Sequence, residues 1–424
     1  MYSRSQNALI LSTTSSFFLW GIIATIGPLS LSFPFLSGVS VPIRTLILST
    51  GPVFVLLGNL SMGYFADRVG RKTVFITTMI SYSIGVIAIT FANTLPMLLV
   101  GLILSQFGVG GEEPSSLALV AEDFDAKKRA SVLTLVANFS NIGSFFISGI
   151  FIVAASATTS LTGLFNIIFP SDFALSDDLF RFVLLLSSIV LVGIMVYSRI
   201  RIPESYRWLN YKGRKEQGLK VKQSLNLEGS ENNIQHKSKF ISMFFLVSMA
   251  ISQYLTFGLM AYIIGPTEFS GSESSELIFY ALLGASIAGF IAMPLVSRNR
   301  KSYTFYAYMG GFLSMVVIFA LVNYLSNLLI FIPLLIVNMA FSEFAWASRT
   351  TLEPELLAIK HRSFGIGIIR MFPMILYIVS ISLTANFSIY QFILYNLGLW
   401  SLGALGAAIW MFYGTETRNI SLDY

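Results

Sequence analysis

Cysteine is absent from this 424-residue chain, histidine occurs twice, and only 11% of the residues are charged. The absence of cysteine excludes disulfides, thiolate nucleophiles and cysteine-containing metal sites. Both histidines, His236 and His361, fall in polar segments between apolar runs, which weighs against a metal centre or a histidine proton relay inside those runs. No nucleotide-binding loop is present, which excludes direct coupling to ATP hydrolysis. We therefore expect no enzyme activity, no cofactor and no metal.

The scarcity of charge accompanies long hydrophobic runs. Soluble globular chains carry about 25% charged residues, whereas here 55% of the residues are hydrophobic and the mean hydropathy is +0.74. Because the runs are continuous, they predict membrane-spanning helices rather than the strands of a barrel, and hence an all-α protein in a lipid bilayer. Hydropathy windows place twelve helices at 10–36, 43–66, 73–92, 95–121, 130–156, 179–201, 241–265, 275–297, 303–325, 328–352, 363–386 and 389–413.

The distribution of positive charge predicts which helix ends face the cytoplasm. If residue 1 is cytoplasmic, every Lys and Arg except Arg44, Arg181, Arg349 and Arg370 falls in the termini and loops on that side. An excess of Lys and Arg marks the cytoplasmic loops of membrane proteins. We therefore expect a multi-pass plasma-membrane protein with both termini cytoplasmic. The net charge of +6 then reflects topology rather than nucleic-acid binding.

Charged motifs repeat on either side of a long basic segment. Glu122 and Arg129 follow the fourth helix, and Glu355 and Arg362 follow the tenth, both at an offset of 233 residues (355 − 122 and 362 − 129). ADRVGRKTVF after the second helix also has a divergent copy, VSRNRKSYTF, after the eighth. The repeats predict two pseudo-symmetric six-helix halves. The predicted units are an N-terminal half at 1–201, a cytoplasmic linker at 202–240, and a C-terminal half with a short cytoplasmic tail at 241–424.

Several of these segments resemble motifs of the major facilitator superfamily. GYFADRVGRK (63–72) is similar to its loop between helices two and three, and PESYRWL and YGTETRNISLDY resemble motifs of its sugar-porter branch. GVGGEEPSS is similar to the Gly-Gly-acid-x-Pro pattern of phosphate and organic-metabolite proton symporters. The resemblance implies the major facilitator fold and alternating access. It leaves the substrate open, because the first helix lacks the usual Asp of sugar porters and at most Gln253 remains of their paired glutamines.

The charges of GYFADRVGRK predict a conformational latch. Asp67 ends the second helix, and the eleventh helix begins on the same side near Ser363, so its positive end and Arg362 are potential partners of Asp67. The neighbouring cations can reach Glu122 or lipid phosphate, and all these contacts require the halves to close on the cytoplasmic side. The alternative is a topogenic positive cluster, to which a lone acid adds nothing. The predicted gating residues are Gly63, Asp67, Arg68, Arg71, Glu122, Arg129, Glu355 and Arg362.

Charged residues at membrane depth are candidates for function, because placing charge there is costly. Glu112 and Glu113 lie roughly 14–15 Å along the helix from Glu122, beside the kink expected at Pro114. Glu112 matches the acid of the Gly-Gly-acid-x-Pro pattern. We expect it to carry the coupling proton, ahead of Glu113 and Glu343.

Arg349 and Arg370 are also candidates for function, because both lie within predicted helices. Arg370 can hold an anionic substrate group, or neutralise Glu343 or Glu112. Arg349 precedes Glu353 by four residues and either snorkels to the cytoplasmic end or contributes to binding. Neutral polar and aromatic residues at similar depth are further substrate-binding candidates, although such residues also make helix–helix contacts. These candidates are Gln106, Asn138, Asn141, Gln253, Tyr254, Asn338 and Trp346.

We therefore predict a monomeric secondary transporter that couples the uptake of a small polar metabolite to protons. The predicted substrate is a sugar or an organic or inorganic anion. Two alternatives remain: an uncoupled facilitator of the same substrates, and a non-transporting membrane sensor with a transporter fold.

Overall fold

The computed structural model describes residues 2–31, 33–36, 38–156, 175–225, 239–269, 272–419 and 422. Within these residues, twelve helices are long and apolar enough to cross a membrane. The prediction of an all-α membrane protein with twelve spanning helices is therefore confirmed.

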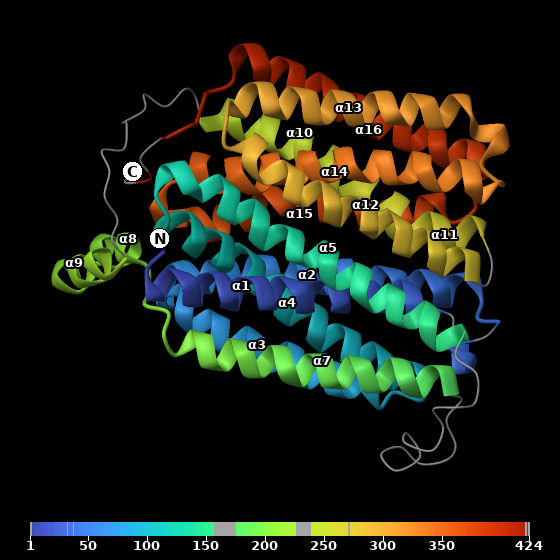
Figure 1. The fold of residues 1–424 in the computed structure, drawn as a ribbon, viewed down its shortest axis with the longest axis horizontal. Helices are drawn as coiled ribbons and strands as arrows, with labels where there is room; N and C mark the ends of the chain where they lie inside the picture. Colours follow the sequence, from blue (N-terminus) through green and yellow to red (C-terminus); the bar gives the residue numbers. More distant parts are fainter. Residues whose placement is uncertain are drawn as a thin grey trace.

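The helices form two groups that lie one above the other in Figure 1. We call α1 to α7 the N-terminal half and α10 to α16 the C-terminal half. The first half contains α1 (Arg4–Ser30), α2 (Val41–Val69), α3 (Arg71–Thr90), α4 (Leu95–Asp123), α5 (Ala126–Ser156) and α7 (Leu175–Arg199). The second contains α10 (Lys239–Gly258), a π-helical turn (Leu259–Ile263), α11 (Ile264–Glu268), α12 (Ser272–Val296), α13 (Arg300–Ala320), α14 (Leu328–Leu356), α15 (Arg362–Thr384) and α16 (Ile389–Tyr413). Short helical turns lie at Pro34–Leu36, Val322–Tyr324 and Ile359–His361.

The first helix starts and ends earlier than its hydropathy predicts. It begins at Arg4 because Ser3 and Gln6 form a capping box. The backbone N–H of Gln6 donates to Ser3 Oγ at 3.2 Å, and the backbone N–H of Ser3 donates to Gln6 Oε1 at 3.0 Å. Polar capping residues do not register in a hydropathy window. The helix ends at Ser30, four residues before Pro34, which has no amide hydrogen with which to continue it.

Two pairs of helices form most of the contact between the halves. α2 packs along α15, and α5 packs along α12. Gly63 allows α2 and α15 to pack closely, because a Cβ added there would lie 3.0 Å from the Ser363 carbonyl oxygen. These pairs are equivalent under the predicted duplication, because α12 repeats α2 and α15 repeats α5. The interface therefore has the two-fold character expected of a duplicated unit.

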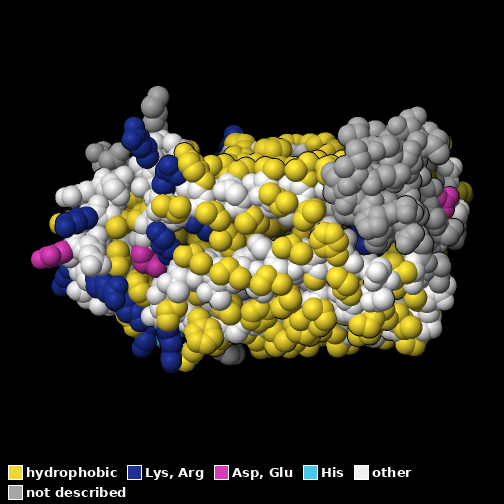
Figure 2. Space-filling model, turned by 90° about the horizontal axis from the view of Figure 1, so that it is seen from below, with side chains coloured by type: hydrophobic (Ala, Val, Ile, Leu, Met, Phe, Trp, Pro, Cys, Tyr) yellow, Lys and Arg dark blue, Asp and Glu magenta, His cyan; other side chains and the backbone are white. Residues whose placement is uncertain are grey.

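Positive charge gathers at one end of the helix bundle. Both chain termini, α8 (Tyr206–Tyr211) and α9 (Lys215–Ser224) lie there (Figure 1), and Figure 2 shows Lys and Arg side chains at the same end beside a broad apolar belt. We call it the basic end. The spanning helices expose apolar side chains such as Ile84, Ile189 and Phe290, as expected of a lipid-facing surface. Helices α8 and α9 occupy the start of the predicted linker, and its residues 226–238 lie outside the described part.

Candidate functional site

A carboxylate of the N-terminal half meets the start of α15 at the basic end. Asp67 accepts hydrogen bonds from the backbone amides of Phe364 at 2.9 Å and Ser363 at 3.4 Å. Arg71, one turn further along the chain, lies 3.1 Å from the same carboxylate. The Asp67 side chain is only 7% exposed. The positive helix end therefore contacts Asp67 as the sequence predicts.

Two further ion pairs join the halves beside this contact, and they are crossed. Arg362 of the C-terminal half lies 2.9 Å from Glu122 of the N-terminal half. Arg129 of the N-terminal half lies 3.9 Å from Glu355 of the C-terminal half. All four side chains are fully buried. In each copy of the repeated motif, the Glu therefore pairs with the Arg of the other half.

Each of these glutamates also has partners in its own half. Arg71 lies 3.2 Å from Glu122, and Arg300 lies 3.2 Å from Glu355. Arg68, by contrast, is exposed and stacks over the Tyr64 ring at 4.2 Å. The structure therefore brings all the predicted gating residues together except Arg68.

The PESYRWL and TETRNISL segments make equivalent contacts in the two halves. Glu204 accepts from the first two amides of α3 at 3.1 and 3.2 Å, and Glu416 accepts from the first two of α13 at 3.1 and 3.3 Å. The Ser205 hydroxyl donates to Glu122, and the Thr417 hydroxyl donates to Glu355 at 2.6 Å. Burial raises the pKa of the Glu204 carboxyl, and hydrogen bonds from backbone amides oppose that shift. The two segments cap a helix and orient a gating glutamate in each half.

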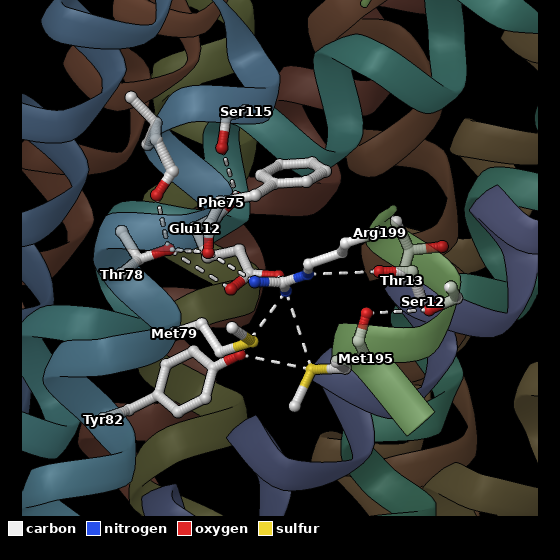
Figure 3. Close-up of polar contacts among 12 residues, drawn as sticks. Ser12, Thr13, Phe75, Thr78, Met79, Tyr82, Glu112, Ser115, Met195 and Arg199 are labelled. Atoms are coloured by element: carbon white, nitrogen blue, oxygen red, sulfur yellow. Dashed lines mark hydrogen bonds and ion pairs between the residues drawn. The ribbon is translucent and has the colours of Figure 1, made fainter. Parts of the chain in front are cut away.

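Glu112 lies inside the N-terminal half, away from α15. It pairs with Arg199 of α7 and accepts a hydrogen bond from the Thr78 hydroxyl at 3.3 Å (Figure 3). The same guanidinium contacts Tyr82 Oη at 3.4 Å and Ser12 Oγ at 3.3 Å. The predicted approach of Arg370 to Glu112 does not occur in this state. All the partners of Glu112 belong to its own half, so this ion pair does not span the interface.

Glu113, and not Glu112, is the acid of α4 that contacts Arg370. It forms an ion pair with Arg370, which also lies 2.9 Å from Glu353. Glu353 contacts Arg349 at 3.0 Å, and Arg349 donates a hydrogen bond to Gln253. The five side chains form a buried network in which only Glu113 belongs to the N-terminal half. Arg349 is thus buried against the carboxylate four residues further along α14 rather than extended to the surface.

Glu343 reaches the other half through α5. Its Oε2 accepts a hydrogen bond from Asn141 at 2.7 Å, and its Oε1 has no hydrogen-bond partner among the described residues. Asn141 in turn contacts Asn138, which donates to the Ser286 carbonyl of α12 at 2.9 Å. The Glu343 side chain is fully buried. It is therefore a carboxylate at the interface between the halves, without a cation in contact among the described residues.

A cavity of about 90 Å³ lies between the halves near mid-depth. Helices α1, α2, α4, α10 and α15 and the π-helical turn surround it, and π-helical turns are frequent at functional sites. Two predicted binding residues, Gln106 and Tyr254, line the cavity. They are joined by aromatic side chains from both halves: Trp20, Phe257, Tyr262 and Tyr377.

A wider cavity opens at the end opposite the basic end. Its volume is about 530 Å³, and its lining includes Arg44, Glu268 and Glu273. Pro28 lines both this cavity and the mid-depth one. A third cavity, of about 400 Å³, lies at the basic end within the C-terminal half, where its lining includes Leu246, Leu357 and Phe364. Between the halves, the two cavities lie at mid-depth and at the end away from the buried ion pairs.

The remaining predicted binding residues lie next to the cavity or away from it. Trp346 packs against Trp20 and Phe257, with ring centroids 5.9 and 6.4 Å apart. Asn338 donates to Ser314 at 2.8 Å within the C-terminal half. Asn138 and Asn338 thus make the helix–helix contacts that polar residues often make in membrane bundles.

Sequence reasoning missed several participants. The charge pattern places Arg199 among the cytoplasmic cations, yet its side chain is buried against Glu112. Its position at the very end of an apolar run is the only sequence signal. The sequence does not distinguish Trp20, Tyr262 and Tyr377, because aromatic residues are spread along the chain and their spacing does not identify the ones that line the cavity.

Comparison with known proteins identifies the family. The minor myo-inositol transporter IolF of Bacillus subtilis is 25% identical over 369 residues, covering 84% of this chain and 77% of that protein. The niacin transporter NiaP of Acinetobacter baylyi is 24% identical over 345 residues, covering 76% and 73%.

The fold matches a solved transporter along its whole length. The proton:xylose symporter XylE of E. coli, bound to 6-bromo-6-deoxy-D-glucose, superposes with a TM-score of 0.78 at 14% identity, covering 99% of this chain and 98% of that one. The family model of the Major Facilitator Superfamily matches residues 9–381. The chain therefore belongs to the Major Facilitator Superfamily of membrane transporters and resembles its sugar-porter branch.

Proposed function

We propose that this transporter takes up a small polar metabolite, a sugar or an organic or inorganic anion, together with protons by alternating access. Similarity to transporters of myo-inositol and niacin, and a fold shared with a proton:xylose symporter, support this choice. The transporter works as a single chain in the plasma membrane. Its basic end, with both termini, faces the cytoplasm, because positive charge is retained on that side.

The observation that carries the proposal is an asymmetry between the two ends of the interface. At the basic end the halves are joined by the Asp67 contact to α15 and by the crossed pairs of Glu122 and Glu355. From mid-depth to the other end, the interface contains the two cavities that are lined by both halves. This arrangement fits a carrier closed toward the cytoplasm. Opening to the cytoplasm requires these polar contacts to break, as alternating access demands.

Glu343 and Glu113 are the proposed sites of proton coupling. Both reach across the interface, Glu343 to Asn141 and Glu113 to Arg370, so movement of the halves changes their surroundings. An ionised carboxylate buried without a cation is unfavourable, and binding a proton removes that charge. Glu343 is therefore the first candidate for the proton-coupling site and Glu113 the second. Glu112 is the third, because it is paired within its own half.

Gln106 and Tyr254 keep their proposed role in substrate binding, because they line the cavity. Arg370 and Arg349 contact carboxylates instead. We assign these two arginines to the switch between states. Trp346 packs against the aromatic residues that line the cavity, and Asn141 orients Glu343 by a hydrogen bond.

The test uses purified protein in proteoliposomes, with labelled myo-inositol, nicotinate or phosphate supplied in turn in the external buffer. We expect an inward proton gradient to drive accumulation by the wild type. Glu343→Gln should retain counterflow exchange and lose accumulation, because the amide mimics the protonated acid and cannot release a proton. Glu216→Gln, at an exposed position of α9, is the matched control.

Each contrary result has a distinct meaning. If Glu343→Gln still concentrates substrate, the coupling site lies elsewhere, and Glu113→Gln is the next variant to assay. Flux that equilibrates without accumulation in the wild type identifies a facilitator. Ligand binding without flux identifies a sensor.

A further inference from the structure

The cavity of about 400 Å³ at the basic end lies within the C-terminal half, and we call it the C-terminal cavity. Side chains from the start of α10, the end of α14 and the first turns of α15 surround it. It shares no lining residue with the two cavities between the halves. Its lining is apolar except for Ser242 and His361, and no Asp, Glu, Lys or Arg is among the described residues that line it. The cavity is therefore suited to an apolar group.

One face of α15 connects the C-terminal cavity with the lipid-facing surface. Phe364 and Ile368 line the cavity. The next residues at helical spacing, Phe372, Ile375 and Val379, are exposed. Side chains three or four residues apart lie on the same face of a helix. The cavity therefore lies on the side of α15 that carries its exposed apolar residues.

The equivalent place in the N-terminal half is occupied by an aromatic ring. Leu357, which lines the cavity, repeats Phe124, and His361 repeats Lys128, both at the offset of 233 residues (357 − 124 and 361 − 128). The Tyr2 ring packs against Phe124 with centroids 5.5 Å apart, and the Lys128 ammonium lies 5.2 Å from the Tyr2 ring centroid. In the C-terminal half the described residues leave this place as a cavity. The repeat thus indicates an apolar occupant beside a cationic side chain.

The size of the C-terminal cavity fits one acyl chain. A cavity of about 150 Å³ holds one benzene, which corresponds to about 25 Å³ per carbon atom. At that ratio, about 400 Å³ accommodates about sixteen carbon atoms. Moving apolar surface out of water into such a site is favourable.

Positive charge next to the cavity favours an anionic head group. Lys360 and His361 are exposed in the short turn Ile359–His361 that precedes α15. Helix α8 packs against this turn, and Lys212, directly after α8, is also exposed. Basic pockets between spanning helices on the cytoplasmic side are typical sites for anionic lipid head groups. A phosphate group there meets cations and no lining acid.

Two lining residues also take part in the contacts that close the basic end. The backbone amide of Phe364 donates to Asp67 at 2.9 Å, and the Leu357 carbonyl accepts from Arg362 Nε at 3.1 Å. Arg362 also pairs with Glu122 of the other half. A group packed against Phe364 and Leu357 therefore favours the arrangement in which these contacts form. Because coupling between two sites is reciprocal, closure of the basic end also favours binding in the cavity.

We propose that the C-terminal cavity binds one acyl chain of an anionic phospholipid from the leaflet at the basic end, with the lipid phosphate at Lys360 and His361. The bound lipid stabilises the state in which the basic end is closed. Lipid binding depends neither on the substrate nor on the coupling ion. Its effect on closure rests on the proposed alternating access.

The test of binding is native mass spectrometry of the purified full-length protein in detergent. The probes are phosphatidylglycerol, phosphatidylcholine with the same acyl chains, and inorganic phosphate. We expect one phosphatidylglycerol to bind roughly tenfold more tightly than phosphatidylcholine, because two cationic side chains face its phosphate. Inorganic phosphate should not displace it, because it lacks the acyl chain.

Two pairs of variants locate the bound lipid. Lys360→Gln should weaken phosphatidylglycerol by about fivefold, and its exposed position keeps this variant independent of folding. Lys127→Gln, at the repeat of Lys360 (360 − 127 = 233), is the matched control and should bind like the wild type. Ser242→Trp fills the cavity and should abolish the preference, whereas Phe244→Trp, at an exposed position of α10, should retain it.

Each contrary result overturns the proposed site. Equal binding of the two lipids removes the anionic head group, and displacement by inorganic phosphate replaces the lipid with a free anion. Unchanged binding in Ser242→Trp places the lipid outside the cavity. An equal loss in Lys127→Gln and Lys360→Gln shows a general effect of surface charge.

The effect on closure has its own measurement. A single cysteine at Ser363, which is buried where α15 meets Asp67, reports opening of the basic end. Phosphatidylglycerol in nanodiscs of phosphatidylcholine should slow maleimide labelling of this cysteine by about threefold, and Lys360→Gln should reduce that effect. Unchanged labelling despite lipid binding contradicts the link to closure.

The outcome is separable from that of the transport assay, since neither measurement requires flux. Phosphatidylglycerol binding without any transport supports the lipid site and contradicts the transporter proposal. Proton-driven accumulation without a preference for phosphatidylglycerol supports the transporter proposal and contradicts the lipid site.

Discussion

The Arg362 guanidinium lies 2.9 Å from the Glu122 carboxylate, although 240 residues separate them in the sequence. The copy of this pair, Arg129 with Glu355, lies at 3.9 Å. The Glu and Arg motif occurs once in each half, and each Arg meets the Glu of the other half. The repeat therefore supplies a symmetric lock between the halves. Because all four groups are buried, releasing the lock requires the basic end to open.

Removing the Asp67 charge should favour the state open to the cytoplasm. Asp67→Asn weakens charge-assisted bonds to two amides of α15, which are worth about 1.5–3 kcal/mol each. We expect folding to be retained and transport to fall strongly. The chain has no cysteine, so single cysteines introduced at either end can report accessibility by labelling. Arg68→Gln alters a neighbouring exposed charge outside the latch and serves as the control. Unchanged labelling and normal transport would show that the segment 63–72 acts only as a topogenic signal.

The two crossed pairs should differ in strength. Arg362→Gln breaks the 2.9 Å pair and Arg129→Gln breaks the 3.9 Å pair, so both should open the basic end and the first should do so more. Loss of one partner of a buried pair costs about 3–5 kcal/mol. Cysteine cross-linking between α2 and α15 measures the closed population, with the exposed Arg201→Gln as the reference. An equal closed population in both variants and the wild type would contradict the lock.

Bulk at Gly63 should prevent closure of the basic end. The added Cβ lies 3.0 Å from the Ser363 carbonyl oxygen, and the two methyl groups of valine have no room between α2 and α15. We expect Gly63→Val to be inserted normally and to show increased labelling from the cytoplasmic side. Gly193→Val is the control, because a Cβ there meets nothing within 4 Å. Wild-type labelling of Gly63→Val would show that the helices need not approach so closely.

The Glu112 and Arg199 pair should behave as a structural unit. Glu112→Gln or Arg199→Met alone leaves a buried charge without its partner and should destabilise the protein by about 3–5 kcal/mol. The double variant removes both charges and should recover most of that loss, since apolar groups often replace a buried pair without cost. Thermal unfolding of the detergent-solubilised variants measures this. Additive losses in the double variant would contradict the pairing.

Lysine at position 370 should affect turnover more than affinity. Arg370 bridges Glu113 and Glu353, and a single ammonium cannot bond two carboxylates with the same planar geometry. Because Arg370 does not line the cavity, ligand affinity should change by less than about threefold while the transport rate drops. A fall in affinity of one to two orders of magnitude would instead identify Arg370 as a direct ligand of an anionic substrate.

Hydropathy and motif spacing are enough to predict the membrane class, the number of helices and the repeated half. These follow from local quantities: hydropathy over about 20 residues and the spacing of charged motifs along the chain. The contact between Asp67 and α15 was also predictable, because both elements end on the same side of the membrane and a helix start attracts a carboxylate.

Which of the buried charges meet depends on how the helices pack in three dimensions. Glu112 and Glu113 are adjacent, so their side chains point about 100° apart on α4. One of these directions faces α7 and Arg199, and the other faces α15 and Arg370. The rotation of α4 that makes this choice is fixed by packing against several distant helices. The aromatic lining of the cavity depends on the same non-local packing.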